Sequence, residues 1–345
     1  MIRRRNLIAL AASAFCAPDV FAQTARSAPA FSWKTASLSP QEFDADLLER
    51  LPALLRTDFP GTMAVTIVRK DQILLDYRRE GSGKDELFRL YSVTKSVLAI
   101  LIGIALDRGI LPSLDGTVVS YFPEIDFSGA DPRTRGITIR QIMTMTAGLS
   151  TASLPGIQPP QVTTTGLFRA IADQPGTVFS YDNNATNILG IVLSRIVGKR
   201  LDVFAEEVLL RPLGITEYRW RQTPDGHPAA SGGLSLSMDS LIRLGRLVSR
   251  KGDWDGQRII SEEFITRMLK PQQLVNTREE LHYGFFWFIQ KTPDGKHDSY
   301  IAQGYGGQVL VAVPALQLIV ATTTQPETGV NTRFIRSMIL PAARG

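Results

Sequence analysis

Cysteine and histidine are scarce in this sequence. The only cysteine is Cys16, close to the N-terminus, and the three histidines, His227, His282 and His297, lie far apart along the chain. Zinc sites need several of these residues at short spacing, so the sequence carries no zinc signature. After residue 16 the chain has no thiol, which excludes disulfides and cysteine catalysis there. The scattered histidines give no indication of a Ser-His-Asp triad.

A strong charge imbalance and phosphate-binding motifs are also missing. The 38 Lys and Arg residues and the 33 Asp and Glu residues give a formal net charge of +5, and beyond the first residues the positive charges form no cluster. No glycine-rich phosphate loop is present. Such scattered charge is typical of a solvated surface, and we expect no nucleic-acid partner.

The N-terminus has the pattern of a secretory leader. Three arginines at positions 3–5 precede a short apolar run over 7–16, and Ala22 is a small residue suited to cleavage. The apolar run is too short to span a bilayer. We therefore expect a signal peptide over 1–22 and a loose lead-in over 23–36. The mature protein should be periplasmic or secreted, without stable insertion in a membrane.

Three stretches of different character follow. The first contains an amphipathic helix expected to start at a capping box over 39–42, a β-hairpin turning at Lys70-Asp71, and an apolar helix over 93–106. Proline and glycine then punctuate short helices up to about residue 234, and no strand pattern stands out there. Apolar strands return in the last third. The elements expected there are strands over 283–289, 299–302, 309–313 and 318–322 and a helix over 332–340.

This order of elements predicts an α/β (α+β) fold. An antiparallel sheet flanked by helices would be completed by both ends of the chain, next to a mostly helical lobe. We expect residues 37–110 and 235–345 to form one discontinuous α/β domain and residues 111–234 to form the mostly helical domain. A cleft between the two lobes is the expected ligand site.

Ser92-Val93-Thr94-Lys95 is the first motif that carries chemistry. Residues three apart on a helix share a face, so Lys95 can act on the Ser92 hydroxyl. A serine needs a base to become nucleophilic, and burial can lower the pKa of a lysine enough for that role. A Ser-x-x-Lys is expected about once by chance in a chain of this length, and Ser92 could be a plain helix cap. However, Lys95 begins an almost wholly apolar helix, where a charge needs a partner or a purpose.

Two loops supply further candidates. Tyr181-Asp182-Asn183 precedes a helix, and Gly304-Tyr305-Gly306-Gly307-Gln308 lies between two expected strands. The first could bring a phenol and an amide to the serine from another lobe, or could be a core tyrosine beside a helix cap. The second could allow a ligand to approach the backbone closely, or could be a plain turn.

Together these motifs resemble those of class C β-lactamases and of their relatives among penicillin-binding proteins, esterases and nylon-oligomer hydrolases. The similarity covers about residues 60 to 325, and Gly304 to Gln308 looks most like the esterases and nylon-oligomer hydrolases. Further stretches similar to the family are Tyr121-Phe122-Pro123, Thr146-Ala147-Gly148-Leu149 and Ser231-Gly232-Gly233-Leu234.

The resemblance implies a β-lactamase-like fold and acyl-enzyme chemistry without metal or cofactor. Ser92 would be the nucleophile, and Lys95 and Tyr181 would share the proton transfers in an order that the sequence leaves open. The oxyanion hole would use the backbone N–H groups of Ser92 and Tyr305. Residues expected to contact the substrate are Asn183, Gly304, Tyr305 and Gln308.

One departure bears on the substrate. β-Lactamases of this type carry Lys-Thr-Gly on the strand beside the serine, whereas Ala302-Gln303-Gly304 stands here. The cation that would help to hold a β-lactam or peptide carboxylate is therefore missing. We expect an ester or amide substrate of small size, with two alternatives: a β-lactamase or D-alanyl-D-alanine carboxypeptidase, and a non-catalytic penicillin-recognition or cell-wall-binding module.

Overall fold

The structure is a computed structural model that describes residues 31–35, 42–151, 162–326 and 332–343. The expected signal peptide, most of the lead-in and the first three residues of the expected capping box lie outside the described residues. In the part of the chain that is described, no helix has both the length and the apolar character needed to cross a membrane.

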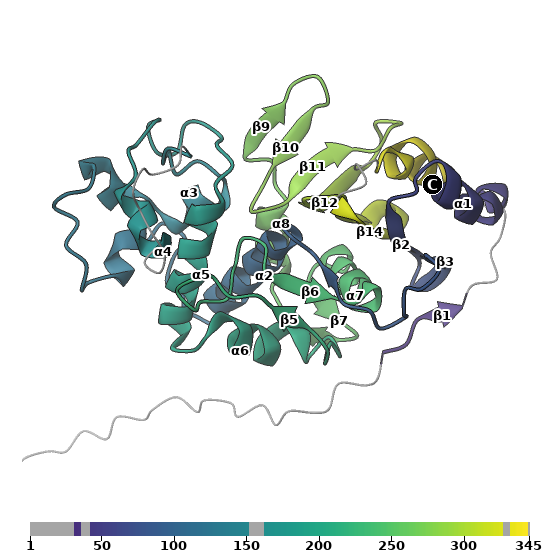
Figure 1. The fold of residues 1–345 in the computed structure, drawn as a ribbon, viewed down its shortest axis with the longest axis horizontal. Helices are drawn as coiled ribbons and strands as arrows, with labels where there is room; N and C mark the ends of the chain where they lie inside the picture. Colours follow the sequence, from purple (N-terminus) through teal and green to yellow (C-terminus); the bar gives the residue numbers. More distant parts are fainter. Residues whose placement is uncertain (1–30, 36–41, 152–161, 327–331, 344–345) are drawn as a thin grey trace, which may run out of the picture.

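A nine-stranded sheet dominates the fold and is built from both ends of the chain (Figure 1). Its strand order is β1-β3-β2-β14-β13-β12-β11-β10-β9, and all neighbours are antiparallel except β1 and β3. The antiparallel sheet expected from the sequence is thus confirmed. The strands are β1 (Lys34–Thr35), β2 (Thr62–Arg69), β3 (Gln72–Arg78), β9 (Gln273–Asn276), β10 (Leu281–Tyr283), β11 (Phe288–Lys291), β12 (Asp298–Gly304), β13 (Gln308–Val313) and β14 (Leu318–Thr324).

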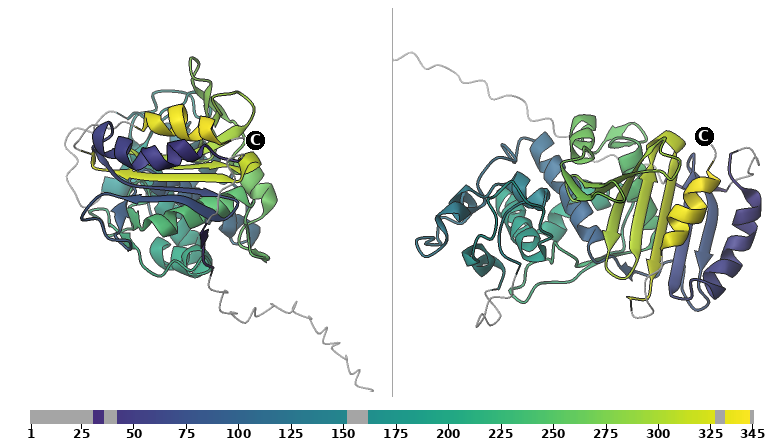
Figure 2. Two further views of the ribbon diagram at one scale, coloured as in Figure 1. Left: turned by 90° about the vertical axis from the view of Figure 1, so that its right-hand side faces the viewer. Right: turned by 90° about the horizontal axis from the view of Figure 1, so that it is seen from above.

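Both faces of the sheet centre are buried, which explains why its strands are continuous apolar runs. On β13, Val309, Val311 and Val313 belong to one core cluster, and the alternate residues Leu310 and Ala312 belong to another. One face is covered by α1 (Ala45–Thr57) and the C-terminal helical segments η7 (Ile335–Ile339) and α9 (Leu340–Ala342). The other is covered by α7 (Met238–Ser249) and α2 (Val93–Asp107), so helices flank the sheet on both sides (Figure 2).

The first helix begins later than the sequence indicated. The N-cap of α1 is Asp44, whose side chain accepts the N–H of Leu47 at 3.1 Å. The expectation of a start at the 39–42 capping box is therefore wrong, because an aspartate closer to the apolar face caps the helix. The hairpin prediction is confirmed: Lys70 and Asp71 have φ of 49° and 60°, the left-handed pair that a tight two-residue turn requires.

The expectation of one strand over 283–289 is also wrong. β10 ends at Tyr283 and β11 begins at Phe288, with a turn closed by the hydrogen bond from Gly284 N to Trp287 O (2.8 Å). Phe286, at a φ of 58°, donates its N–H to the Met143 carbonyl of the helical lobe. The apolar run resembles a strand in sequence because this turn has only one glycine to mark it.

The helical lobe lies at the end of the sheet nearest β9, β10 and β11 (Figure 1). The short helices that the sequence predicts there are present. Its elements are η1 (Val118–Tyr121), η2 (Pro132–Gly136), α3 (Ile139–Met143), α4 (Val162–Thr165), η3 (Gly166–Phe168), α5 (Asn183–Val197), α6 (Leu201–Ala205) and η4 (Glu206–Leu210).

A small second sheet joins the helical lobe to the rest of the chain. In it β6 (Leu234–Leu236) pairs with both β4 (Phe88–Arg89) and β5 (Arg219–Trp220). The pairing crosses the expected boundary near residue 234, and β5 is a strand that the sequence pattern did not reveal. The division into two domains stays a prediction. The remaining elements are β7 (Asp253–Trp254), β8 (Gln257–Arg258), α8 (Glu262–Met268) and η5 (Pro314–Leu316).

Candidate active site

Ser92 lies at the sharp entry to α2, directly after the buried residue Leu90 and the strained Tyr91 (φ 48°). It occupies the N-cap position, but its side chain makes no capping hydrogen bond. Instead, its Oγ is 2.9 Å from Lys95 Nζ. A role as a plain helix cap therefore explains the position of Ser92 at the start of α2. It does not explain why its hydroxyl contacts Lys95 and not a backbone N–H of the helix. The turn is held by Thr94, whose hydroxyl donates to the Tyr91 carbonyl (2.6 Å) and accepts the Leu234 N–H (3.2 Å).

Lys95 is buried, with 1% of its surface exposed. Its Nζ has three oxygen neighbours: Ser92 Oγ at 2.9 Å, Asn183 Oδ1 at 2.7 Å and the Ser231 carbonyl at 2.6 Å. Among the described residues, no carboxylate forms an ion pair with it. Burial lowers the pKa of Lys95 to about 7, and the negative charge of Asp182 opposes that shift. The lysine is thus poised to gain or lose a proton near neutral pH.

Tyr181 approaches from the loop before α5. Its ring centroid is 4.9 Å from Lys95 Nζ, and its hydroxyl lies close enough to the Ser92 side chain to interact with it. Burial raises the pKa of Tyr181, and the interaction with the Ser92 hydroxyl opposes the rise. Behind this loop, the rings of Phe179 and Tyr283 meet edge to face at 5.1 Å. The loop thereby brings a phenol and the Asn183 amide to the serine and the lysine.

The β12–β13 turn forms the opposite side of the site. A Cβ on Gly304 would lie 2.2 Å from the Leu90 carbonyl oxygen and 3.2 Å from Ser92 N, so only glycine allows β12 to pass this close. Tyr305 is 69% exposed, and its ring is 5.6 Å from that of Tyr91. Gln308 is buried, and its amide binds the Thr324 carbonyl (2.9 Å), so it supports the turn. Contact between Gln308 and a substrate stays a prediction.

The structure brings Ser92, Lys95, Tyr181 and Asn183 together, with Gly304 beside the serine backbone. Sequence reasoning missed several supporting groups. The Ser231 carbonyl lies in a stretch noted only for its similarity to the family. Thr94 was hidden inside the first motif, and nothing in the sequence indicated Arg169, which pairs with Asp182. The residues assigned to catalysis and binding are therefore neighbours, and their roles stay predictions.

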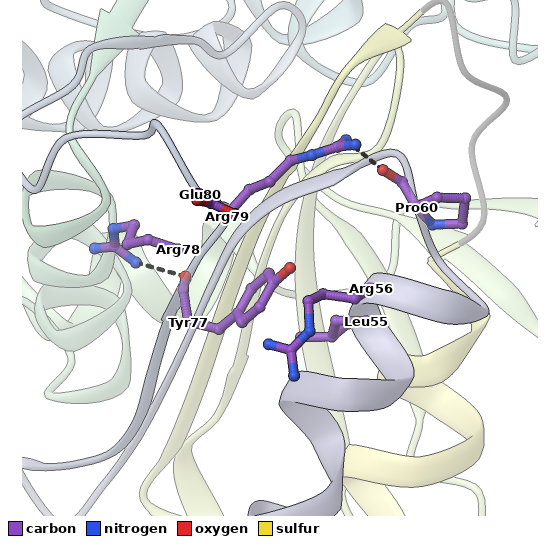
Figure 3. A pocket seen from close by; sticks show the side chains of 7 residues that line it. All are labelled: Leu55, Arg56, Pro60, Tyr77, Arg78, Arg79 and Glu80. Carbon is purple, nitrogen blue, oxygen red and sulfur yellow. Dashed lines mark hydrogen bonds between the residues drawn. The ribbon is translucent and has the colours of Figure 1, made fainter.

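Other candidate chemistry lies elsewhere. His282 Nδ1 contacts the Glu280 carbonyl, and no hydrogen bond joins any of the three histidines to Ser92 within the described segments. Nor do those segments hold a group of three or more histidine, cysteine or acidic residues that could bind a metal. A separate pocket lies beside α1 and β3, where Arg79 donates to the Pro60 carbonyl (Figure 3). It contains none of the predicted site residues.

Comparison with known proteins places these observations in a family. The chain is 28% identical to protein Rv1367c of Mycobacterium tuberculosis, over 65% of this chain and 71% of that protein. It is 24% identical to the 6-aminohexanoate-dimer hydrolase of Paenarthrobacter ureafaciens, over 65% of this chain and 61% of the enzyme. The solved structure of a family VIII carboxylesterase matches with a TM-score of 0.68 at 17% identity, covering 90% of this chain and 98% of that one, which shows the fold. Residues 45–337 match the Beta-lactamase family model, and the chain therefore belongs to the Beta-lactamase family of hydrolases.

Proposed function

We propose that this protein is a serine hydrolase that forms an acyl-enzyme on Ser92 and hydrolyses a small ester or amide. The observation that carries the proposal is the contact of 2.9 Å between Ser92 Oγ and Lys95 Nζ, together with a lysine pKa of about 7. A nucleophile and a base at hydrogen-bond distance are the first requirement for this chemistry.

The neighbours of Lys95 support its action as a base. A neutral amine has two N–H donors and one lone pair. The Asn183 Oδ1 and Ser231 carbonyl oxygens only accept hydrogen bonds, so together they use both donors. The lone pair is then left for the hydroxyl of Ser92. In this state Lys95 can take the serine proton as the Oγ–carbon bond forms.

The proton must next reach the leaving group. Lys95 and the Tyr181 hydroxyl both lie close to Ser92 and can pass it to the departing alcohol or amine as the scissile bond breaks. In the second half of the reaction, the same two groups take a proton from water as water attacks the acyl carbon, and they return it to Ser92 Oγ. Because coupled groups titrate as a pair, we assign both steps to the Lys95–Tyr181 pair and not to one residue.

An oxyanion hole from the backbone N–H groups of Ser92 and Tyr305 fits this scheme. Gly304 allows the end of β12 to run beside the backbone of Ser92, and Tyr305 is the next residue along the chain. Neither N–H is used in a backbone hydrogen bond within the described part of the chain. Two such donors stabilise the negative charge that develops on the carbonyl oxygen in the transition state.

The strand beside the serine favours an ester or amide over a β-lactam. β12 ends with Ala302-Gln303-Gly304, so a buried, neutral Ala302 stands where the family's β-lactamases have a cation. Names of relatives also point to esters and amides, since they include a 6-aminohexanoate-dimer hydrolase and a carboxylesterase. β-Lactamase or carboxypeptidase activity is the second candidate, and we propose export to the periplasm or the medium on the leader sequence alone.

A purely binding role is the remaining alternative. A binding module would not need a buried lysine whose charge is unpaired, because burying such a charge without an ion-pair partner destabilises the fold. The convergence of Ser92, Lys95 and Tyr181 therefore supports turnover.

The deciding experiment compares wild type with Ser92→Ala on a p-nitrophenyl ester of a short acid and on a chromogenic cephalosporin. We expect ester turnover to fall by more than about 10³-fold in Ser92→Ala. Ser120→Ala, which removes an exposed hydroxyl of the helical lobe, is the matched control. Mass spectrometry should find the acyl group on the tryptic peptide that contains Ser92.

Equal turnover by Ser92→Ala and wild type would disprove the assignment. Dominant cephalosporin turnover that depends on Ser92 would instead favour the β-lactamase alternative. Inertness of the wild type towards both probes and towards a small amide panel would favour the binding module.

A further inference from the structure

A buried ion pair lies directly behind the site. Arg169 Nη2 is 2.6 Å from Asp182 Oδ2, and the two side chains are 6% and 7% exposed. By contrast, the Arg195–Glu124 pair of the same lobe is 40% and 53% exposed. A buried pair loses much hydration for little net stability, so its presence calls for a reason other than holding the fold together.

Asp182 fixes the segment that carries two of the predicted site residues. Its Oδ1 accepts the N–H groups of Asn184 (2.9 Å) and Ala185 (3.0 Å), which caps α5. Its immediate neighbours are Tyr181 and Asn183. One carboxylate therefore sets the backbone from which both the phenol and the amide reach Lys95.

Arg169 ties this carboxylate to two other parts of the lobe. Its Nε donates to the Gly166 carbonyl (2.8 Å) and its Nη1 to the Ser150 carbonyl (2.9 Å). With Nη2 on Asp182, the guanidinium is engaged on three sides and its orientation is fixed. Movement of Asp182 would require that these contacts break together.

We propose that Arg169 and Asp182 are a positioning pair for the reaction at Ser92: they hold Tyr181 and Asn183 in place, and their opposed charges set how readily Lys95 takes up a proton. This inference rests on the proposed function, because it concerns the base of that reaction. Neither residue contacts the reacting atoms, so neither is a catalytic residue.

The electrostatic part of the argument has a definite sign. The other groups that face Lys95 are Ser92 from α2, Tyr181 and Asn183 from the loop and α5, and the Ser231 carbonyl. Tyr283 lies behind Tyr181. All of these are neutral near pH 7, so Asp182 is the nearby charge that favours protonated Lys95. Arg169, bound to Asp182, offsets part of that charge.

Two substitutions that break the same ion pair should therefore act in opposite directions. Asp182→Asn keeps an oxygen to cap α5 but removes the negative charge, so the pKa of Lys95 falls and the acid limb of kcat/KM moves to lower pH. Arg169→Gln removes the positive charge and leaves Asp182 on its two N–H donors, so the limb moves to higher pH. For charges several ångströms apart in a partly buried site, we expect shifts of about 0.5–1.5 pH units.

The test is the pH profile of kcat/KM for the p-nitrophenyl ester, each profile normalised to its own maximum so that loss of folded protein does not move the limb. Glu124→Gln and Arg195→Gln, which break the exposed pair, are the matched controls and should leave the limb within about 0.2 units, since exposed pairs are weak and screened. If Arg169→Gln does not fold, Asp182→Asn alone decides by the direction of its shift.

Shifts of opposite sign in the two variants would support the proposal. Shifts of the same sign, or unmoved limbs in active variants, would overturn it and leave only a structural role for the pair. Failure of the proposed function is a separate outcome, because it would appear as Ser92→Ala turnover equal to that of wild type.

Discussion

Two sides of the site face each other across Ser92. The sheet wall is the β12–β13 turn, which contributes backbone, and the helical wall is the loop that carries Tyr181 and Asn183, which contributes side chains. On the sheet side, Gly304 brings the backbone of β12 close to Leu90 and Ser92, and the side chain of the next residue, Tyr305, is mostly exposed. On the helical side, Tyr181 and Asn183 bring side chains, whose loop is held by a buried carboxylate and a helix cap.

This difference determines which substitutions each wall tolerates. On the sheet wall, the exposed side chain of Tyr305 can be replaced, but no Cβ can be added at Gly304, where β12 passes the serine. Where side chains make the contact, their functional groups cannot be removed, although the backbone conformation is an ordinary loop before a capped helix.

The helical wall should show the largest effect on removal of a single atom. Tyr181→Phe keeps the ring beside Lys95 but loses the hydroxyl that lies near Ser92. We expect kcat for the p-nitrophenyl ester to fall by about 10²–10⁴-fold, the usual contribution of a positioned acid or base. Tyr121→Phe, also in the helical lobe, is the control. A loss of less than about threefold would show that the Tyr181 hydroxyl takes no part in proton transfer.

The sheet wall should be equally intolerant of one added methyl group. In Gly304→Ala the new Cβ would meet the Leu90 carbonyl at 2.2 Å, so β12 or the turn before Ser92 must move. Displacement of one oxyanion donor costs about 10²–10³ in kcat. Gly83→Ala, where the added Cβ would meet no atom within 4 Å, is the control.

Thermal unfolding of Gly304→Ala would complement the kinetics. We expect a loss of stability of about 1–3 kcal/mol, as for other overpacked sites. Wild-type activity in a folded Gly304→Ala would show that the close approach of β12 to Ser92 is not needed for catalysis.

The same two walls show how far the sequence predicts the structure. Ser92 and Lys95 are predictable from the sequence because one helical turn separates them, and β13 and β14 are predictable because strands buried on both faces are apolar throughout. Glycine density marked the β12–β13 turn. By contrast, the Arg169–Asp182 pair joins residues without a shared motif, and the turn after Tyr283 has apolar residues at its centre. The ion pair and the turn both depend on tertiary contacts, which a local sequence pattern cannot predict.

Lys95 lies between the walls, and its charge should affect stability as well as rate. Its pKa is about 7 in the folded protein and 10.5 for an ordinary lysine, so between these values the unfolded chain binds a proton that the folded protein does not. The free energy of unfolding should therefore rise with pH across this window, by at most about 1.4 kcal/mol per pH unit. Below pH 7 this contribution should no longer change.

Lys95→Met isolates this contribution, because the variant keeps an unbranched side chain of similar length without the charge. We expect the unfolding free energy of wild type, measured by urea denaturation, to rise steadily relative to that of Lys95→Met from pH 7 to pH 9. A constant difference over that range would mean that Lys95 stays protonated in the folded protein and does not serve as the base.

The smallest effect is expected for the exposed side chain on the sheet wall. Tyr305→Ala keeps the backbone N–H that we assign to the oxyanion hole and removes only a ring that pairs with Tyr91 at 5.6 Å. An aromatic pair contributes about 0.5–1.5 kcal/mol, so kcat/KM should fall by no more than about tenfold. If Tyr305→Ala loses as much activity as Gly304→Ala, the ring itself binds the substrate, and the sheet wall acts through a side chain just as the helical wall does. If it loses far less, the wall acts through its backbone, and the identity of residue 305 is free to vary with the substrate.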